Sequence, residues 1–289
     1  MDEGPVLRRH RLGGELKRCR EAAGLTQEAV SRQFEWHTAK VTRIETARVA
    51  VTPRDVRDLL TLYGVRDDAY RESLIELARK ARERTWRSEY SDVTRSKFVG
   101  LEAGASAMLC WEPTLIPGLL QTERYMRSLV GAALPAEQPD AVQRRIAMRL
   151  IRQHRLTEPS PLLLKAIIDE SVLHRAVGDD DTMADQLRHV RDAATVLPNV
   201  TVQILPFAAG AHQLLGGPAT LLEFGTAADR DVLYLEGFTD NFEHRPAAVT
   251  RFRAAFDLLS ERALDERTSI DLIDRMIKAE ATARPDHQW

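Results

Sequence analysis

Two short segments near the N-terminus read Gly24-Leu25-Thr26-Gln27-Glu28-Ala29 and, starting nine positions after Ala29, Thr38-Ala39-Lys40-Val41-Thr42-Arg43-Ile44-Glu45. Thr26 is a favourable N-cap, because its hydroxyl can accept a hydrogen bond from the first turn of a helix. The inward side of that helix is predicted to be Ala29, Val30 and Phe34. A further helix is predicted from His37 to Arg48, so the two segments form a pair of short helices joined by a turn.

Helices are also predicted on both sides of this pair. Before it, Leu16, Cys19 and Ala23 form one apolar stripe of a helix that Gly24 ends. After it, the run Thr52-Pro53-Arg54-Asp55 is typical of a helix start, with a cap, a proline in the first turn and an early acid. The apolar face of this last helix is Val56, Leu59, Leu60 and Tyr63, and Gly64 ends it. These four helices predict a compact all-α unit.

The helix from His37 to Arg48 has an unusual outward face. At about 100° per residue, an arc of roughly 140° contains Thr38, Ala39, Thr42, Arg43 and Thr46. Val41, Ile44 and Glu45 fall on the opposite side. A surface helix usually exposes Glu and Lys, whereas a helix that enters a DNA groove about 12 Å wide needs short side chains and a few long ones. The helix alone is also compatible with a solvated face that is merely rich in threonine.

The spacing of the two segments resembles the XRE family of lambda-repressor-like helix-turn-helix proteins. The resemblance implies that Gln27 bonds a phosphate, that Thr38, Ala39, Thr42 and Arg43 read bases, and that Lys40 and Thr46 contact phosphate. The resemblance also implies that Arg20 pairs with Glu45. His37, at the start of the helix, is included in the predicted DNA-binding set. Arg43 could grip a guanine edge with two hydrogen bonds, the commonest specific contact. The turn Phe34-Glu35-Trp36-His37 departs from the Leu-Gly-Val-Ser of many relatives, with a poor cap at His37 and a larger residue at Trp36.

Composition and charge narrow the class of protein. The chain has 289 residues, a net charge of −2 and two cysteines, Cys19 and Cys110, which are far apart and predict neither a disulfide framework nor a cysteine zinc site. Residues 1–85 contain 18 Lys and Arg against 14 Asp and Glu, and the remainder contains 23 against 29. A basic N-terminal unit joined to an acidic larger one favours nucleic-acid binding by the first. With no apolar run of about 18 residues and no signal-peptide pattern, we expect a cytoplasmic protein that does not act at a membrane.

The middle of the chain is predicted to connect two domains. Asp67 to Arg87 is typical of a solvated linking helix, and Glu102 to Met108 continues in helical composition. The segment from Trp111 to Tyr125 contains two prolines and a glycine among apolar residues, which predicts a buried, sharply turning loop. Such a loop is either a structural plug or one wall of a binding site. The next helix is predicted to be capped by Thr122.

The string Pro113-Thr114-Leu115-Ile116-Pro117-Gly118-Leu119-Leu120-Gln121-Thr122 resembles the C-terminal domain attached to XRE-type regulators in actinobacteria, the WhiJ-like, antitoxin-like group. Further matches are Arg149, Arg152-Gln153, Leu156, Val202 to Phe207, Gly210-Ala211-His212, Gly217-Pro218 and Leu233 to Glu236. The resemblance implies a transcriptional regulator whose larger domain has no assigned biochemical role, and a small partner protein as a serious candidate.

The C-terminal part is predicted to be an α/β domain with a small mixed sheet. Leu162 to Ile168 and Val200 to Leu205 are candidate parallel strands connected through a helix from Thr182 to Val196. A hairpin is predicted from Ala219 to Phe224 and Val232 to Glu236, followed by helices that begin at Pro246 and Ser269. The predicted domains are therefore a helix-turn-helix domain over residues 1–66, a linking helix over 67–92 and a regulatory or dimerisation domain over 93–289.

The chemistry of this larger domain is weakly marked in the sequence. No nucleophile elbow, phosphate loop or His-Glu-x-x-His pattern is present, so we expect no catalytic residues, no metal site and no cofactor. A small-molecule pocket formed by Trp111, His212 and Tyr234 is favoured over a catalytic site. A dimerisation or partner surface is an equally favoured interpretation of this domain. We therefore expect a sequence-specific regulator that binds double-stranded DNA as a homodimer. The alternatives are an antitoxin-like protein-interaction module and, less favoured, an enzyme with a DNA-binding tether.

Overall fold

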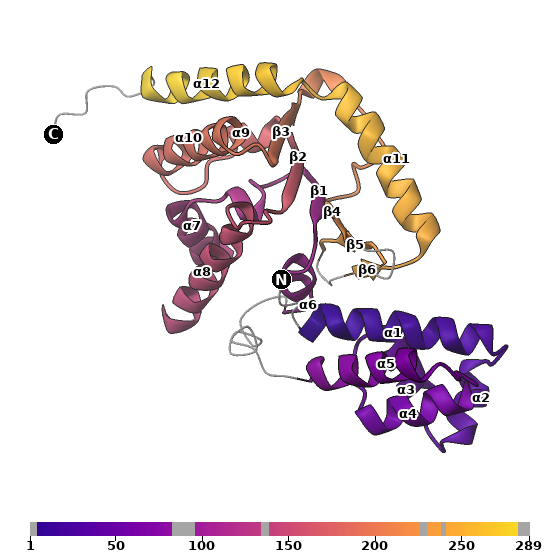
Figure 1. The fold of residues 1–289 in the computed structure, drawn as a ribbon. Helices are drawn as coiled ribbons and strands as arrows, with labels where there is room; N and C mark the ends of the chain where they lie inside the picture. The colour runs from indigo at the N-terminus through magenta and orange to yellow at the C-terminus, as the bar shows by residue number, and fades with distance from the viewer. Residues whose placement is uncertain (1–4, 83–95, 134–138, 226–229, 238–240, 283–289) are drawn as a thin grey trace. The chain divides into compact units, whose positions relative to one another are not determined.

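The computed structural model describes residues 5–82, 96–133, 139–225, 230–237 and 241–282 (Figure 1). The chain divides into two compact units. One comprises Met1–Gly104 with Phe224–Arg230, and the other comprises Ala105–Glu223 with Asp231–Trp289. Each unit is described by itself below. The predicted class, a helical N-terminal region and an α/β C-terminal region with a mixed sheet, is confirmed.

The N-terminal unit is built, in its described residues, from helices joined by turns and short loops. Its helices are α1 (Pro5–Ala22), α2 (Gln27–Gln33), α3 (Thr38–Glu45), α4 (Pro53–Leu62), α5 (Asp68–Lys80) and α6 (Ser96–Glu102). The predicted caps are present, because the hydroxyl of Thr26 accepts from the Ala29 N–H at 3.1 Å and that of Thr52 accepts from the Asp55 N–H at 3.0 Å. Helix α5 is shorter than predicted, and the part of that prediction beyond Arg82 lies outside the described residues.

The helices α1, α2, α3, α4 and α5 share one apolar core. Its buried members are Leu12, Leu16, Cys19, Val30, Val41, Ile44, Val51, Val56, Leu59, Leu60, Tyr63, Leu74, Ile75 and Ala78. Ala23, predicted to lie on the buried stripe of the first helix, is exposed and follows the last residue of α1. Three residues of α5 lie in this core, so α5 packs as part of the helical unit.

The second unit contains a six-stranded sheet with the order β3-β2-β1-β4-β5-β6. The strands are β1 (Ala107–Glu112), β2 (Leu163–Asp169), β3 (Val200–Leu205), β4 (Ala219–Glu223), β5 (Val232–Leu235) and β6 (Asn241–Glu243). Strands β1, β2 and β3 are parallel, as predicted for the last two, and β4, β5 and β6 are antiparallel. The prediction that Glu102 to Met108 is helical was wrong, because Ala107 and Met108 pair with both β2 and β4.

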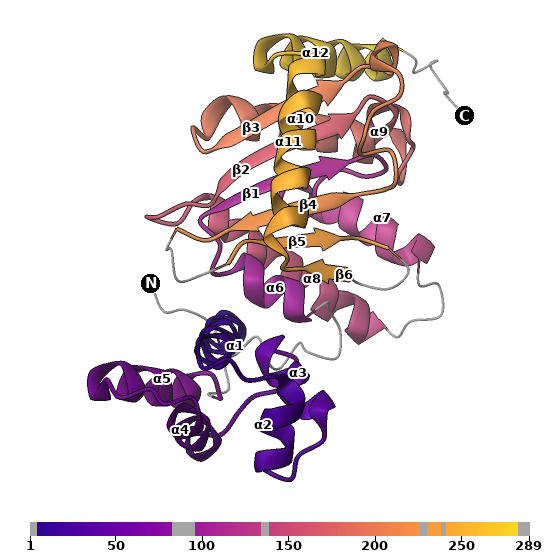
Figure 2. The ribbon, with the colours of Figure 1, turned by 90° about the vertical axis from the view of Figure 1, so that its right-hand side faces the viewer.

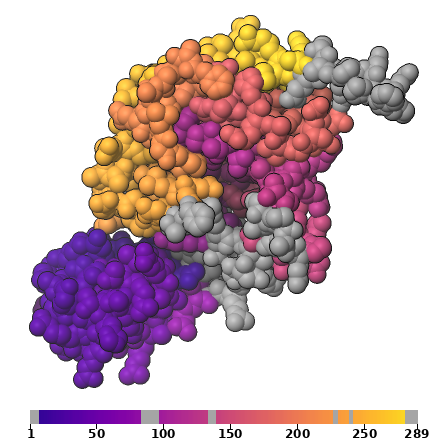
Figure 3. Space-filling view, turned by 180° about the vertical axis from the view of Figure 1, so that it is seen from behind, coloured from indigo at the N-terminus to yellow at the C-terminus, as the bar shows by residue number. Residues whose placement is uncertain are grey.

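Helices cover both faces of this sheet. Helix α11 (Pro246–Arg262) crosses one face of the sheet (Figure 2). Phe252 and Phe256 of this helix lie in one buried cluster with Trp111 and Ile167. On the other side lie α7 (Glu123–Ala133), α8 (Pro139–Gln153), the short α9 (Ser171–His174) and α10 (Asp180–Val196). Helix α12 (Glu266–Thr282) packs on α10 and β3 at one end of the sheet, and Figure 3 shows its yellow surface beside the salmon surface of α10.

The proline-rich segment before α7 is irregular, as its composition predicts, with one short 3₁₀ turn at Gly118–Leu120. Trp111 and Glu112 are an exception, because they still belong to β1. Buried glutamines satisfy the main chain of the segment. Gln186 donates to the Leu120 carbonyl at 2.6 Å and accepts from the Thr122 N–H at 2.7 Å, while Gln121 donates to the Ile116 carbonyl at 2.7 Å. These bonds supply the partners that buried irregular backbone needs.

Candidate nucleic-acid interface

Helices α2 and α3 are joined by a turn that holds a strained residue. Glu35 lies at φ 54°, in the left-handed region that glycine adopts most easily. The ring of Trp36 stacks on Phe34 with centroids 4.9 Å apart, so aromatic packing stabilises the turn. His37 is the N-cap of α3 and makes no side-chain capping bond. Helix α3 ends at Glu45, three residues earlier than predicted, because Ala47 turns the chain with φ 57°.

A buried ion pair connects α1 to the inner side of α3. Arg20 Nε and Nη2 donate to Glu45 Oε1 and Oε2 at 2.6 and 3.1 Å, and the two side chains are 9% and 3% exposed. Arg20 also donates to the Leu25 carbonyl at 2.7 Å, ahead of α2. The hydrogen bond to Glu45 raises the pKa of the Arg20 guanidinium above its ordinary value. Because the pair is two-pronged and buried, it fixes the direction of α3 relative to α1.

A close approach of backbones fixes the same helix from a second side. A Cβ atom on Gly13 of α1 would lie 2.6 Å from the carbonyl oxygen of Ile44 and 2.9 Å from that of Glu45. Any larger residue at position 13 would therefore push the C-terminal end of α3 away. Gly13 could not be singled out from the sequence, because a glycine within a helical pattern has no specific meaning without the fold.

Gln27, the first residue of α2, lies between the ion pair and the outer face of α3. Its Nε2 donates to Glu45 Oε2 at 2.7 Å, and its Oε1 accepts from the hydroxyl of Thr42 at 2.8 Å. The hydroxyls of Ser31 and Thr38 lie 3.2 Å apart and form a second link between the two helices. The structure therefore brings together Arg20, Glu45, Gln27 and Thr42 in one connected network.

The remaining predicted residues lie on the outer face of α3 or at its ends. His37, Ala39, Thr42 and Arg43 are exposed, and Thr38, Lys40 and Thr46 are half-buried. Arg43 Nε donates to the Ala39 carbonyl at 3.1 Å, and the Thr46 hydroxyl donates to the Thr42 carbonyl at 2.7 Å. The face that sequence periodicity placed outside is outside, and Val41, Ile44 and Glu45 are buried.

Lys40 is held beside the face by two neighbours. Its ammonium lies 3.3 Å from the centroid of the Trp36 ring and 3.7 Å from Asp55 Oδ2. Both contacts are partly exposed, with Lys40 37% and Asp55 26% exposed at their side chains. Asp55 was not predicted as a partner of Lys40, although its place three residues after the Thr52 cap already put it near the start of α4.

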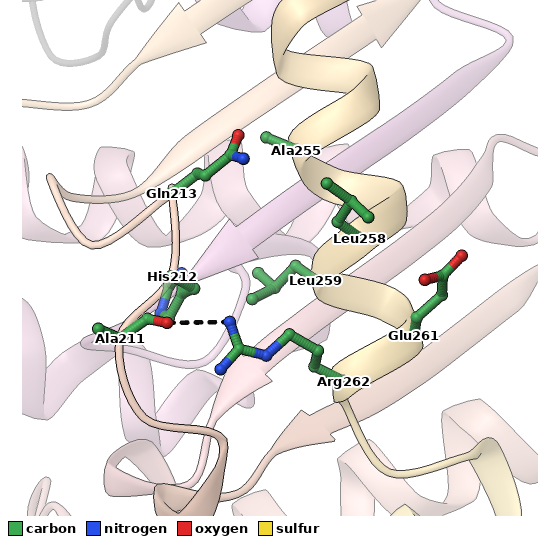
Figure 4. A pocket seen from close by; sticks show the side chains of 8 residues that line it. All are labelled: Ala211, His212, Gln213, Ala255, Leu258, Leu259, Glu261 and Arg262. Atoms are coloured by element: carbon green, nitrogen blue, oxygen red, sulfur yellow. Dashed lines mark hydrogen bonds between the residues drawn. The ribbon is translucent and has the colours of Figure 1, made fainter.

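The C-terminal unit contains an open groove of about 590 Å³ between residues 211–213 and α11 (Figure 4). Its lining includes His212, Leu258, Leu259 and Arg262. Arg262 Nη1 donates to the Ala211 carbonyl at 2.9 Å, and its Nη2 donates to the Ala209 carbonyl. Leu258 is 51% exposed, so the wall formed by α11 is partly apolar and open.

Of the three residues predicted to form a pocket, only His212 lines this groove. Trp111 is fully buried beneath it, where its Nε1 donates to the Leu214 carbonyl at 2.7 Å and its ring meets His212 edge-on with centroids 4.9 Å apart. Tyr234 lies on the opposite face of the sheet, because the register pairs Trp111 with Ala219 and Leu235 but pairs Cys110 with Thr220 and Tyr234. The structure thus brings Trp111 and His212 together and leaves Tyr234 apart.

The environment of His212 favours its neutral form. Burial, and then the positive charge of Arg262, lower the pKa of the imidazole. Nδ1 accepts a hydrogen bond from the Leu214 N–H at 3.2 Å, which requires that this nitrogen carry no proton. Among the described residues no cluster of His, Cys, Asp or Glu suited to a metal ion is found. None of the helices within those residues is long and apolar enough to cross a bilayer.

Helices α2 and α3 are joined by a tight turn, α3 exposes its outer face, and its inner side is fixed by the Arg20–Glu45 pair and by Gly13. This arrangement defines a helix-turn-helix protein, here joined to an α/β domain. Comparison with known families agrees, since residues 11–74 match a model described as a helix-turn-helix domain. Residues 95–275, more than half of the chain, match the model described as a domain of unknown function, DUF5753, and the chain belongs to that family. Neither the curated proteins nor the solved structures contain a match to the chain.

Proposed function

We propose that the chain is a sequence-specific, DNA-binding transcriptional regulator that places α3 in the major groove of an operator. The exposed face of α3 carries this proposal. Ala39 and Thr42 are short and outward, Arg43 is an exposed long cation beside them, and the inner side is held by Gly13 and the buried Arg20–Glu45 pair. The major groove admits a helix whose contact side is short, and the rigid inner side sets the helix in place before it binds.

The outer residues suit different kinds of contact. The Nε–H of Arg43 donates to Ala39, which uses one of five guanidinium donors and leaves the two Nη groups for guanine O6 and N7. Gln27 Nε2 has a second N–H beyond the one given to Glu45, and that donor suits a phosphate oxygen. Lys40, Thr46 and His37, at the borders of the face, are the further candidates for phosphate contacts, which set register without reading sequence.

A charge placed on the centre of the face tests the proposal. Ala39→Glu adds a carboxylate where the groove would lie, and like charges in contact cost several kcal/mol, so we expect affinity for a selected duplex to fall by about a hundredfold or more. Ala69→Glu is the matched control, because Ala69 is an exposed helical alanine on α5. The selected duplex comes from random-sequence DNA bound by the full chain and is titrated at fixed salt. Equal binding by Ala39→Glu and the native chain contradicts the proposal.

We further propose that the protein acts as a homodimer. Helix-turn-helix proteins of this kind read two half-sites about 34–36 Å apart, one helical turn, and a two-fold dimer matches a palindromic operator. Light scattering of the free protein, together with the symmetry of the selected sites, tests this. A monomer that selects single half-sites overturns it.

The role proposed for the C-terminal unit is regulatory rather than catalytic. The groove beside His212 supports this role, because it combines the apolar wall at Leu258 with polar groups from Arg262 and the loop, as in sites for small effectors or for a side chain of a partner protein. Leu258→Glu tests this role in an operator-binding assay with small molecules and partner proteins from a cell extract. If the variant responds to them like the native chain, the groove does not receive the signal.

A further inference from the structure

The hydrogen bonds behind α3 have a fixed direction. A guanidinium has only donors, and an ionised carboxylate has only acceptors. Arg20 therefore donates both bonds to Glu45, and the carboxylate can accept from Gln27 but cannot donate to it. The amide nitrogen of Gln27 must face Glu45, since the reversed amide would bring its oxygen against a carboxylate oxygen.

This orientation decides the direction of the last bond. With Nε2 on Glu45, the amide oxygen Oε1 faces Thr42 and lies 2.8 Å from the Thr42 hydroxyl. An amide oxygen accepts only, so the hydroxyl donates its single proton inward. The other group near this hydroxyl is the Thr38 carbonyl at 3.3 Å, which is also an acceptor. Both inward neighbours therefore draw the proton of Thr42 away from the exposed side.

We propose that Thr42 presents only acceptor lone pairs to the major groove, and so selects a base whose exocyclic amine lies in that groove, adenine through N6 or cytosine through N4. This inference rests on the proposed function. A free threonine hydroxyl can donate or accept and discriminates poorly among base edges. Guanine O6 and N7 and thymine O4 are acceptors, and none of them can bond to a hydroxyl whose proton is held by Gln27.

Base analogues test the polarity of this contact. The full chain is bound to its selected duplex, in which single adenines are replaced by purine and single cytosines by 2-pyrimidinone, so that only the amine is lost. At one position we expect the loss of the amine to weaken binding by about tenfold, within the range of a good base contact. At that position Thr42→Val, which keeps the shape and removes the hydroxyl, should be insensitive to the analogue, and Thr42→Ser should remain sensitive.

The result that overturns the inference is equally specific. If removal of a base acceptor, such as N7 in a 7-deazapurine, is what distinguishes the native chain from Thr42→Val, then Thr42 donates. If no analogue distinguishes the two proteins, Thr42 reads no base. A native chain that selects no sequence at all refutes the proposed function itself, and this outcome differs from selection that does not depend on an amine.

A second variant tests the relay behind Thr42. In Gln27→Ala the inward acceptor at 2.8 Å is gone, and the hydroxyl can turn outward without leaving an amide oxygen unbonded. We expect overall affinity to fall, and the preference at the Thr42 position to broaden from adenine or cytosine to all four bases. The ratio of affinities at that position is the readout, because a loss of packing or of a phosphate contact lowers binding to all sequences alike. An unchanged ratio shows that Gln27 does not set the polarity of Thr42.

Discussion

The helical unit and the α/β unit both enclose polar side chains, and these side chains bond to different kinds of partner. In the helical unit, Arg20 and Gln27 both donate to Glu45, and the network ends at Thr42 on an exposed surface. In the α/β unit, Gln186 and Gln121 bond to main-chain groups of a buried loop. The first network orients a surface, whereas the second closes hydrogen bonds that an irregular backbone leaves open. Of these two networks, only the one in the helical unit reaches the face proposed to bind DNA.

The largest effect is expected from breaking the ion pair. Glu45→Ala leaves the Arg20 guanidinium buried without its partner, which typically costs about 3–5 kcal/mol of folding free energy. Urea denaturation followed by circular dichroism measures the loss. Glu76→Ala is the control, because its pair with Arg79 is exposed and contributes about 0–1 kcal/mol. Equal effects of the two substitutions would show that the buried pair does not stabilise the helical unit.

The corresponding substitution in the α/β unit is Gln186→Ala. It removes the partners of the Leu120 carbonyl and the Thr122 N–H, and each orphaned buried group costs about 1–3 kcal/mol. We expect lower thermal stability with unchanged DNA binding by the helical unit below the transition. Gln213→Ala, at an exposed position, serves as the control. Reduced sequence preference in Gln186→Ala would contradict the separation of the two networks.

Arg43→Ala should have the opposite effects, with weaker DNA binding and unchanged stability. The Arg43 side chain is exposed, and its Nε donates to the Ala39 carbonyl within the same helix. Removal of this side chain should therefore leave the free energy of unfolding unchanged. Affinity for the selected duplex should fall by about 1–3 kcal/mol, with relaxed preference at one base pair. Fluorescence anisotropy with matched and single-mismatch duplexes measures this. A loss of the same size on random DNA would identify Arg43 as a phosphate contact instead.

The smallest expected effect is a pH dependence at His212. Its pKa is lowered in the folded protein, so below the unfolded value of about 6.5 the unfolded chain takes up the proton more readily. The unfolded and folded chains bind the same number of protons at His212 at neutral pH, so His212 has no effect on stability there. The free energy of unfolding declines slightly as the pH falls from about 6.5 through the folded pKa. His212→Gln should flatten that part of the profile in thermal denaturation. A native chain that is more stable at pH 5.5 than at pH 7, by an amount that the variant loses, would reverse the sign.

Local sequence signals predicted the helical unit well. Thr26 and Thr52 mark helix starts through their own hydroxyls, and the face of α3 follows from periodicity, so short-range chemistry was sufficient. The link from Gln27 to Thr42 could not be predicted, because it spans 15 positions and depends on the rotamers of both side chains. Asp55 and Trp36 around Lys40 were missed for the same reason.

Long-range pairing explains most errors in the α/β unit. Ala107 and Met108 were predicted to be helical from composition, and they form part of a strand because β2 and β4 pair with them on both sides. Without β1 in place, the sequence could not show that Trp111 and Tyr234 lie on opposite faces, since a shift of one residue in register exchanges the faces of a strand. The continuous apolar run of β2 and the hairpin of β4 and β5 carried stronger signals and were predicted correctly.

Dimethyl sulfate protection on a selected duplex tests the central claim most directly, because the reagent methylates guanine N7 in the major groove. With α3 seated in that groove and Arg43 on a guanine edge, the native chain should protect one guanine in each half-site. Arg43→Ala, at a concentration that saturates the duplex, should leave that same guanine reactive. Full reactivity of every guanine in the presence of bound native protein would contradict the account.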